Sequence, residues 1–471
     1  MDPVLYWNDV ALEANKVSHT NGKGEQTGPP LSARALGLVH LAVYDAFVGT
    51  QAAPPFPPYL TIGPAPAGAS TDAAVAGAAH AMLSALFPSQ KPYFDARHAQ
   101  AGLSGSAGSL DDGNAYGVAV TQALLTDRAV KADPGVGDDG YAPSMARGAH
   151  RVDPDNPGQG YHAPFYGERS RCFAVTKKHE LDAPPRPGQP AYRVALRQVR
   201  GKGIAPALAG TLPPGLAYRS AEEAVVGLFW GYDGAIGLGT PPRLYNQIVR
   251  LVAQAQGNSV ADNARLFALV NVAMADAGIL AWREKYRYDL WRPVLGIREH
   301  DTSMGPAGAP KNPISGNCDP AWLPLGAPAT NATGERYAKD FTPPFPAYPS
   351  GHATFAAAAF QVTRLFYGQG APGPDTLLAG LGVVSEELNG ASTDNTGTVR
   401  SRHTRSFPGG LWEAMVENAA SRVFLGVHWL FDGYAEGPGG GIDVTQNIGG
   451  VALGLAIADD IFTNGLVESP V

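Results

Sequence analysis

Apolar residues along much of this chain recur at intervals of three and four, the spacing of one face of an α-helix. In residues 31–48, Leu36, Val39 and Val43 follow this spacing, with other apolar residues beside them. Alternation of apolar and polar residues with period two is scarce, so the sequence predicts an all-α fold. The segments with helical spacing are residues 31–48, 73–87, 112–130, 220–230, 241–256, 260–290, 352–366, 376–389, 410–432 and 443–462.

Glycine and proline separate these helical segments. The chain holds 58 glycines and 41 prolines among 471 residues. They cluster in residues 51–70, 132–168, 183–216, 302–333, 367–375 and 434–441. Such clusters predict helical bundles joined by long, irregular loops, which often form walls, lids or binding surfaces. No linker or internal repeat stands out, so we expect residues 1–471 to form a single integrated unit.

Composition narrows the class of protein. The chain of 471 residues is 44% apolar and 16% charged, as expected of a soluble globular protein with a large core. Its formal net charge of -7 argues against a nucleic-acid partner, which would require a basic face. No apolar run approaches the length of a membrane span. No signal peptide is visible, which favours a cytoplasmic protein unless a leader has been removed.

The sequence also limits the chemistry that cysteine or a short motif can supply. Cys172 and Cys318 are too few for a disulfide scaffold and lack zinc-site spacing; whether they pair is left open. The metalloprotease, EF-hand, P-loop and nucleophile-elbow patterns are not found. The candidate chemistry lies instead in three short motifs within residues 280–435.

The first motif supplies two cations. Lys285 and Arg292 are seven residues apart, which places them on one face of a helix. Pro293 disfavours helical geometry at Arg292, so we expect the helix to end there. The alternative is an ordinary solvated cationic face, the role expected of Arg283 and Arg287 nearby.

The second motif, residues 349–352, lies before an alanine-rich helical segment. Backbone N–H groups at such a helix start favour an anion, and Gly351 allows close approach of the backbone. Ser350 could instead be a simple N-cap. His352 could likewise be a structural histidine.

The third motif supplies a guanidinium, an imidazole and a carboxylate. Ser421 and His428 are seven residues apart, and Asp432 lies four residues after His428. If one helix continues through this segment, Asp432 can bond the second imidazole nitrogen of His428. Arg422 can reach the same place with its long side chain. Taken alone, His428 could be structural.

The three motifs together predict a pocket for a multiply charged oxyanion such as phosphate or vanadate. Two imidazoles remain, one to contact the central atom and one to transfer protons. His40 and His80 lie in apolar helical stretches and are expected to be structural. The pocket residues are Lys285, Arg292, Ser350, Gly351, His352, Arg422 and His428.

These motifs resemble the signature shared by vanadium-dependent haloperoxidases and the type-2 phosphatidic acid phosphatase superfamily: Lys-x6-Arg-Pro, Pro-Ser-Gly-His and Ser-Arg-x5-His-x3-Asp. Further segments resemble the fungal-type vanadium chloroperoxidases, and the likeness spans nearly the whole chain, with some loops shorter. These segments are residues 5–8, 28–34, 230–234, 239–246, 341–352 and 393–397.

The resemblance implies an all-α fold built around two four-helix bundles, with vanadate as the prosthetic group. It makes His428 the axial vanadium ligand and His352 the acid–base residue. Asp233 would pair with Arg422, and Trp282 and Phe345 would line the halide side. An aromatic residue in the place of Phe345 favours chloride, where bromoperoxidases often carry histidine. The residues implied to hold the vanadate oxygens are Lys285, Arg292, Ser350, Gly351 and Arg422.

The expected function is oxidation of chloride or bromide by hydrogen peroxide, followed by halogenation of a small organic acceptor. Lys285 would assist by polarising the peroxide. The first alternative is an acid phosphatase with a phosphohistidine at His428, and the second is an oxyanion-binding protein without turnover. The motifs leave open the halide preference, the acceptor and whether the protein is a homo-oligomer.

Overall fold

The computed structural model describes residues 2–130, 136–309, 315–332 and 340–471, and these confirm the all-α fold class. The only regular sheet among these residues pairs β1 (Val383–Val384) with β2 (Thr404–Arg405). The helices are α1 (Pro3–Ser18), α2 (Pro29–Gly49), α3 (Thr71–Leu86), α4 (Lys91–Ala99), α5 (Ala107–Val130), α6 (Tyr166–Arg169), α7 (Pro190–Lys202), α8 (Ala221–Phe229), α9 (Pro241–Ala255), α10 (Val260–Tyr288), α11 (Pro293–Arg298), α12 (Gly351–Phe366), α13 (Gly410–Phe424), α14 (Leu430–Gly433) and α15 (Gly449–Asn464).

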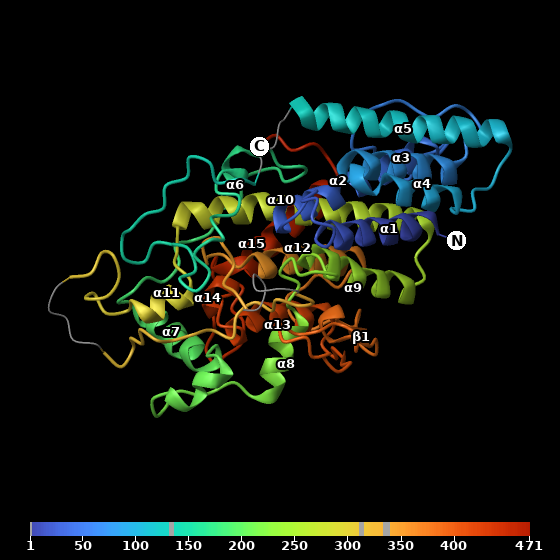
Figure 1. The fold of residues 1–471 in the computed structure, drawn as a ribbon. Coiled ribbons are helices and arrows are strands. Elements are labelled where there is room, and N and C mark those ends of the chain that lie inside the picture. The colour runs from blue at the N-terminus through green and yellow to red at the C-terminus, as the bar shows by residue number, and fades with distance from the viewer. Residues whose placement is uncertain (1, 131–135, 310–314, 333–339) are drawn as a thin grey trace.

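The helices form two groups that share a long central element (Figure 1). In the first group, α3 packs against α5 and α2. In the second, α12 packs against α10, α13 and α15. The central helix α10 also packs along α2, which joins the groups through a continuous core.

Glycine lets α15 pack closely on the start of α12. A Cβ added at Gly450 would lie 2.5 Å from Ser350 O. One added at Gly454 would lie 2.5 Å from both Ala357 Cβ and Thr354 O. Neither position accepts a larger side chain without a shift of α12. This close packing fixes the first turn of α12, which carries the second motif.

The helix that carries Lys285 ends earlier than the sequence predicts. A capping box at Ser259 starts α10, and Asp289 ends it in the left-handed conformation with φ 47°. Arg292 is instead the N-cap of α11, where the fixed backbone angle of Pro293 suits the first helical turn. Lys285 and Arg292 therefore do not share one helix, and a turn brings them together.

Two further helix predictions were wrong in part. Residues 410–432 form α13 and α14 with a break between them, and Gly426 in the break has φ 74°, which favours glycine. Residues 376–389 form turns, β1 and a short 3-10 helix at Glu386–Leu388. The helices α1, α4 and α7 were not among the predicted segments.

Two of the described helices, α2 and α10, are long and apolar enough to cross a membrane by length and composition alone. In the fold, 89% of the most apolar 18-residue stretch of α2 is buried inside the protein, and 94% of that of α10. Because the two helices pack against each other in the core, burial in protein accounts for their composition. Cys172 and Cys318 are also buried and are not joined to each other.

Candidate active site

The three motifs meet within the second group of helices. Lys285 lies near the end of α10, Ser350 caps α12, and Arg422 lies near the end of α13. The Ser350 backbone N–H donates to Asp432 O at 2.8 Å, which ties the second motif to the third. The inner cavity, as we call the space between them, is lined by residues that include Asp233, Trp282, Phe345, Gly351, His352, Arg422 and His428.

The ammonium group of Lys285 is buried and donates to backbone oxygens. Nζ lies 2.8 Å from Pro346 O, 3.3 Å from Ala347 O and 2.6 Å from Pro349 O. Burial and the Arg292 guanidinium lower the pKa of Lys285 well below its usual value. Oxygens that only accept hydrogen bonds oppose this shift and favour the ammonium form. Lys285 thus supplies charge and holds the backbone that leads into α12.

Arg292 has a buried nitrogen that no described residue satisfies. Nε donates to Phe345 O at 2.9 Å and Nη1 to Val427 O at 2.8 Å, whereas Nη2 is buried without a partner. Burial lowers the pKa of Arg292 to about 9, so the guanidinium stays charged at neutral pH.

Arg422 shows the same feature. Nη2 donates to both carboxylate oxygens of Asp233, at 2.8 and 2.9 Å, while Nε and Nη1 are buried without a partner in the described structure. A buried donor left unpaired costs about 1–3 kcal/mol, and more when charged. The free nitrogens of Arg292 and Arg422 therefore fit a multiply charged oxyanion, and vanadate meets that requirement.

The start of α12 adds neutral donors. Ser350 is the N-cap, and its Oγ accepts a hydrogen bond from the Ala353 backbone N–H at 3.4 Å. Gly351 is the first helical residue, and a Cβ added there would lie 3.3 Å from the Trp282 ring. The helix start and its dipole favour an anion. Ser350 therefore caps α12 through its Oγ, and its hydroxyl hydrogen can still donate to a bound anion.

His428 and Asp432 form a buried pair. His428 Nδ1 lies 2.8 Å from Asp432 Oδ2, which also accepts from the Trp429 backbone N–H at 2.9 Å. Because Asp432 accepts both bonds, the imidazole proton lies on Nδ1 and Nε2 keeps its lone pair. Nε2 accepts from Arg292 Nη1 at 2.9 Å. Burial and nearby cations lower the pKa of His428 well below its usual value, so Nε2 can serve as a ligand atom.

His352 has the complementary arrangement. Its Nε2 lies 2.7 Å from Gly231 O and 3.9 Å from Asp233 Oδ1. Since a carbonyl only accepts, Nε2 carries the proton and Nδ1 is the nitrogen that can take another. Burial and the Arg422 guanidinium lower the pKa of His352 to about 3, so the ring is neutral at neutral pH. The lone pair of Nδ1 is therefore free, but with this pKa the ring is a weak base; an anion bound beside it and Arg422 would raise the pKa toward the range useful for proton transfer.

Trp282 and Phe345 form an aromatic wall of the inner cavity. Their ring centroids are 4.8 Å apart. Lys285 Nζ and Arg292 Cζ each lie 5.0 Å from the centroid of the Phe345 ring. By excluding water on this side, the rings strengthen the field of the cations at the cavity.

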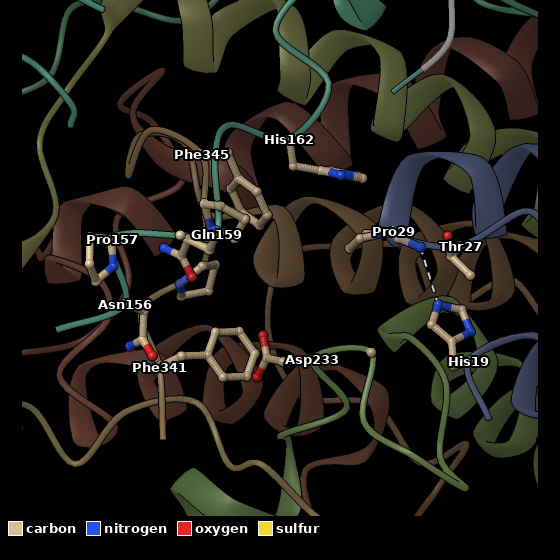
Figure 2. A pocket seen from close by; sticks show the side chains of 15 residues that line it. His19, Thr27, Pro29, Asn156, Pro157, Gln159, His162, Asp233, Phe341 and Phe345 are labelled. Carbon is tan, nitrogen blue, oxygen red and sulfur yellow. Dashed lines mark hydrogen bonds between the residues drawn. The ribbon is translucent and has the colours of Figure 1, made fainter. Parts of the chain in front are cut away.

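A larger pocket of about 540 Å³ lies beside the inner cavity (Figure 2). We call it the vestibule. The two spaces share the side chains of Asp233 and Phe345. Other residues that line the vestibule include His19, Thr27, Asn156, Gln159, His162 and Phe341.

Sequence reasoning missed two residues that support the site. The His162 ring lies 6.2 Å from that of Phe345 and 6.3 Å from that of Trp282, between centroids. Glu387 is buried and accepts from the Tyr232 backbone N–H at 3.0 Å, which holds the loop that carries Asp233. Neither residue belongs to a motif or shows a spacing that could have revealed its place.

Other candidate residues lie apart from the inner cavity. His40 bonds Leu36 O at 2.8 Å and the Asn8 amide at 2.9 Å inside the first group of helices, a structural role. His80 bonds Asp95 at 2.7 Å near the surface. The glutamate partners of Arg283 and Arg287 are Glu168, Glu180 and Glu284.

Comparison with known proteins matches both groups of helices. Residues 1–159 match the vanadium chloroperoxidase N-terminal domain, and residues 265–456 match the second helical-bundle domain of the same family. The chain is 38% identical to vanadium chloroperoxidase of Curvularia inaequalis, over 99% of this chain and 90% of that protein.

Solved structures agree at the level of the fold. A bacterial vanadium-dependent iodoperoxidase has a TM-score of 0.66 at 19% identity, covering 98% of this chain and 97% of its own. A holo-type bacterial vanadium-dependent chloroperoxidase has a TM-score of 0.62 at 14% identity, covering 95% of each chain.

Fold and site together define the helical class of vanadium-dependent haloperoxidases. Within that class, the chain belongs to the vanadium chloroperoxidase family.

Proposed function

We propose that this protein oxidises chloride as well as bromide with hydrogen peroxide. As a member of its family it is a vanadium-dependent haloperoxidase, with vanadate as its cofactor. The observation that carries the proposal is the set of buried, unpartnered guanidinium nitrogens of Arg292 and Arg422 beside His428. Chloride gives up electrons less readily than bromide and needs a more strongly polarised oxidant, which buried cations behind an aromatic wall can supply.

Each residue has a role in this proposal. Arg292 and Arg422 bind the oxyanion, and the backbone N–H of Gly351 and the hydroxyl of Ser350 donate to it. His428 Nε2 is the ligand to the central atom, held by Asp432. When bound, vanadate supplies Lewis acidity that activates peroxide for attack by halide.

His352, Lys285 and the aromatic wall act around that centre. His352 Nδ1 takes a proton from peroxide, and Asp233 stabilises the imidazolium that results. Lys285 stabilises negative charge that develops during halide attack. Trp282 and Phe345 exclude water from the halide side.

The phosphatase alternative is not favoured. It uses the same cations, with His428 as the nucleophile and His352 as the acid. The relative that matches nearly the whole chain at 38% identity is a vanadium chloroperoxidase. A rate of halide oxidation measured with chloride, bromide and iodide on the vanadate-loaded protein tests the proposal; oxidation of bromide and iodide without chloride contradicts its chloride part.

Replacement of Lys285 by alanine is expected to slow halide oxidation by about 100-fold. Orthovanadate affinity should fall less, by about tenfold, because Arg292 and Arg422 still bind the oxyanion. Both effects are measured on one preparation, by steady-state kinetics and by equilibrium dialysis. Arg287→Ala, an exposed cation on the same helix, should change neither quantity. A larger loss of affinity than of rate would reverse the role assigned to Lys285.

Replacement of Phe345 by histidine is expected to lower the ratio of chloride to bromide oxidation by about tenfold. The imidazole brings water and a hydrogen-bonding group to the halide side, which weakens the field of Lys285 and Arg292 there. The test compares kcat/KM for the two halides at one pH. Phe56→His, a partly buried ring that packs on Tyr44 and is not among the residues that line the inner cavity or the vestibule, is the matched control. If the ratio of kcat/KM for chloride to that for bromide is unchanged in Phe345→His, Phe345 does not set the halide preference.

A further inference from the structure

The vestibule is larger than the small reactants of halide oxidation require. Its volume of about 540 Å³ lies in the range of pockets that hold small organic molecules. It borders the inner cavity at Asp233 and Phe345, so a molecule bound there would lie next to the place where halide is oxidised. The lining of the vestibule indicates what kind of molecule it accepts.

Two side-chain amides give the vestibule a fixed hydrogen-bonding character. Asn156 Nδ2 donates to Asp153 Oδ2 at 2.8 Å, and Gln159 Nε2 donates to Thr342 O at 2.9 Å. Both partners are acceptors. Rotating either amide by half a turn would place its oxygen against the acceptor oxygen, so the observed orientation is fixed. Asp153 is itself held, since the same oxygen accepts from the Thr342 backbone N–H at 2.9 Å.

The oxygen atoms of the two amides are therefore open to a ligand, as is the buried Nε2 of His162. In Figure 2, the oxygens of Asn156 and Gln159 lie on the side of Phe341 and Asp233, and the nitrogens point away. Neither oxygen has a hydrogen-bond partner among the described residues. A ligand that fits must donate hydrogen bonds here.

Apart from Asp233, the rest of the lining is apolar or electrically neutral. Phe341 and Phe345 offer aromatic faces, and Pro29, Pro157, Pro343 and Pro344 also line the vestibule. Burial lowers the pKa of His19, and lowers that of His162 to about 4, so both rings are neutral at neutral pH. Asp233 is already paired with Arg422. Such a lining suits a flat, neutral molecule and offers an anion no cationic partner.

We propose that the vestibule binds the organic acceptor, and that this acceptor is a neutral electron-rich aromatic with an O–H or N–H donor, such as a phenol or an indole. The donor bonds the amide oxygens of Asn156 and Gln159, and the ring packs between Phe341 and Phe345. The inference rests on the proposed function, because the hypohalous acid formed in the inner cavity is the halogen source.

The reaction at the vestibule balances without another reagent. A ring carbon forms a bond to the halogen of the hypohalous acid, and the halogen–oxygen bond breaks. The ring then loses its proton, which joins the hydroxide to give water. The products are the halogenated aromatic and one water molecule.

Binding can be tested without turnover. The full-length, vanadate-loaded protein without peroxide is titrated into 4-fluorophenol and, separately, into 4-fluoroanisole, and the fluorine NMR line width is followed. We expect saturable binding of the phenol and about tenfold weaker binding of the ether, which lacks the donor. Asn156→Leu and Gln159→Leu should each weaken phenol binding several-fold. Gln122→Leu, an exposed position on α5, is the matched control.

Equal binding of phenol and ether, or unchanged binding in both leucine variants, would overturn the inference. The rate of vanadate-dependent iodide oxidation is also measured without any organic acceptor. If iodide is oxidised, the proposed function holds, and a negative binding result concerns the vestibule alone. If vanadate-dependent iodide oxidation occurs but the ortho-to-para ratio of brominated phenol equals that given by free hypobromous acid, the vestibule does not hold the acceptor. A ratio that differs, and that moves toward the free value in Gln159→Leu, supports the inference.

Discussion

Replacement of His428 by alanine is expected to lower the affinity of the protein for orthovanadate by about 100-fold or more. The variant loses the neutral Nε2 that the Asp432 contact holds ready as a ligand. Arg292 and Arg422 can still attract the oxyanion, so weak binding should persist. Affinity is measured by equilibrium dialysis, with the melting temperature as a check that the variant folds.

Two matched variants sharpen this test. Asp432→Asn keeps the His428 ring but removes the acceptor that fixes its tautomer, and should lower affinity by about 10- to 100-fold. His80→Ala removes a histidine near the surface of α3 and should bind vanadate like the parent. Tight vanadate binding in a folded His428→Ala variant would show that His428 is not the ligand.

Replacement of His352 by alanine should leave vanadate bound and slow halide oxidation by about 100- to 10,000-fold. The variant lacks the Nδ1 that we propose takes the proton; Nε2 of the parent donates to Gly231 O and orients the ring. The measurement is the rate of bromide oxidation from pH 5 to pH 8 at saturating vanadate, together with vanadate affinity.

The pH profile distinguishes proton transfer from simple positioning. Loss of a proton acceptor should make the variant respond to added buffer base, since the missing imidazole leaves space for a small base to take its place. A variant with the rate and pH profile of the parent would exclude His352 as the acid–base group. A large loss of vanadate affinity would make it a ligand instead.

The helical fold class was predictable because its signal is local. Apolar spacing depends on residues within one helix, and it located α2, α9, α10 and α12 closely. The ends of the helices were harder to predict. The end of α10, for example, depends on the left-handed conformation of Asp289 and not on Pro293. The segment 376–389 has helical spacing but packs as turns, since tertiary contacts outweigh local preference.

The structure brings the three motifs together, but the geometry in which they meet was not predictable from the sequence. The His428–Asp432 contact was expected along one helix, yet it forms where the chain turns into the short helix α14. That arrangement depends on Gly426 and on packing between distant segments. The vestibule could not be predicted because it also depends on packing between distant segments. It combines residues near 19–29, 156–162 and 341–345, which share no regular spacing.

If this cation cluster binds vanadate and uses it to oxidise halide, the metal-free protein should gain halogenating activity when vanadate is added. The most direct test adds orthovanadate to the metal-free protein and assays it with peroxide, chloride or bromide and a halogen-acceptor dye, with a phosphate ester in parallel. We expect halogenation that requires vanadate and no appreciable ester hydrolysis. Hydrolysis of the ester that vanadate abolishes, without halogenation, would contradict it and make His428 a nucleophile.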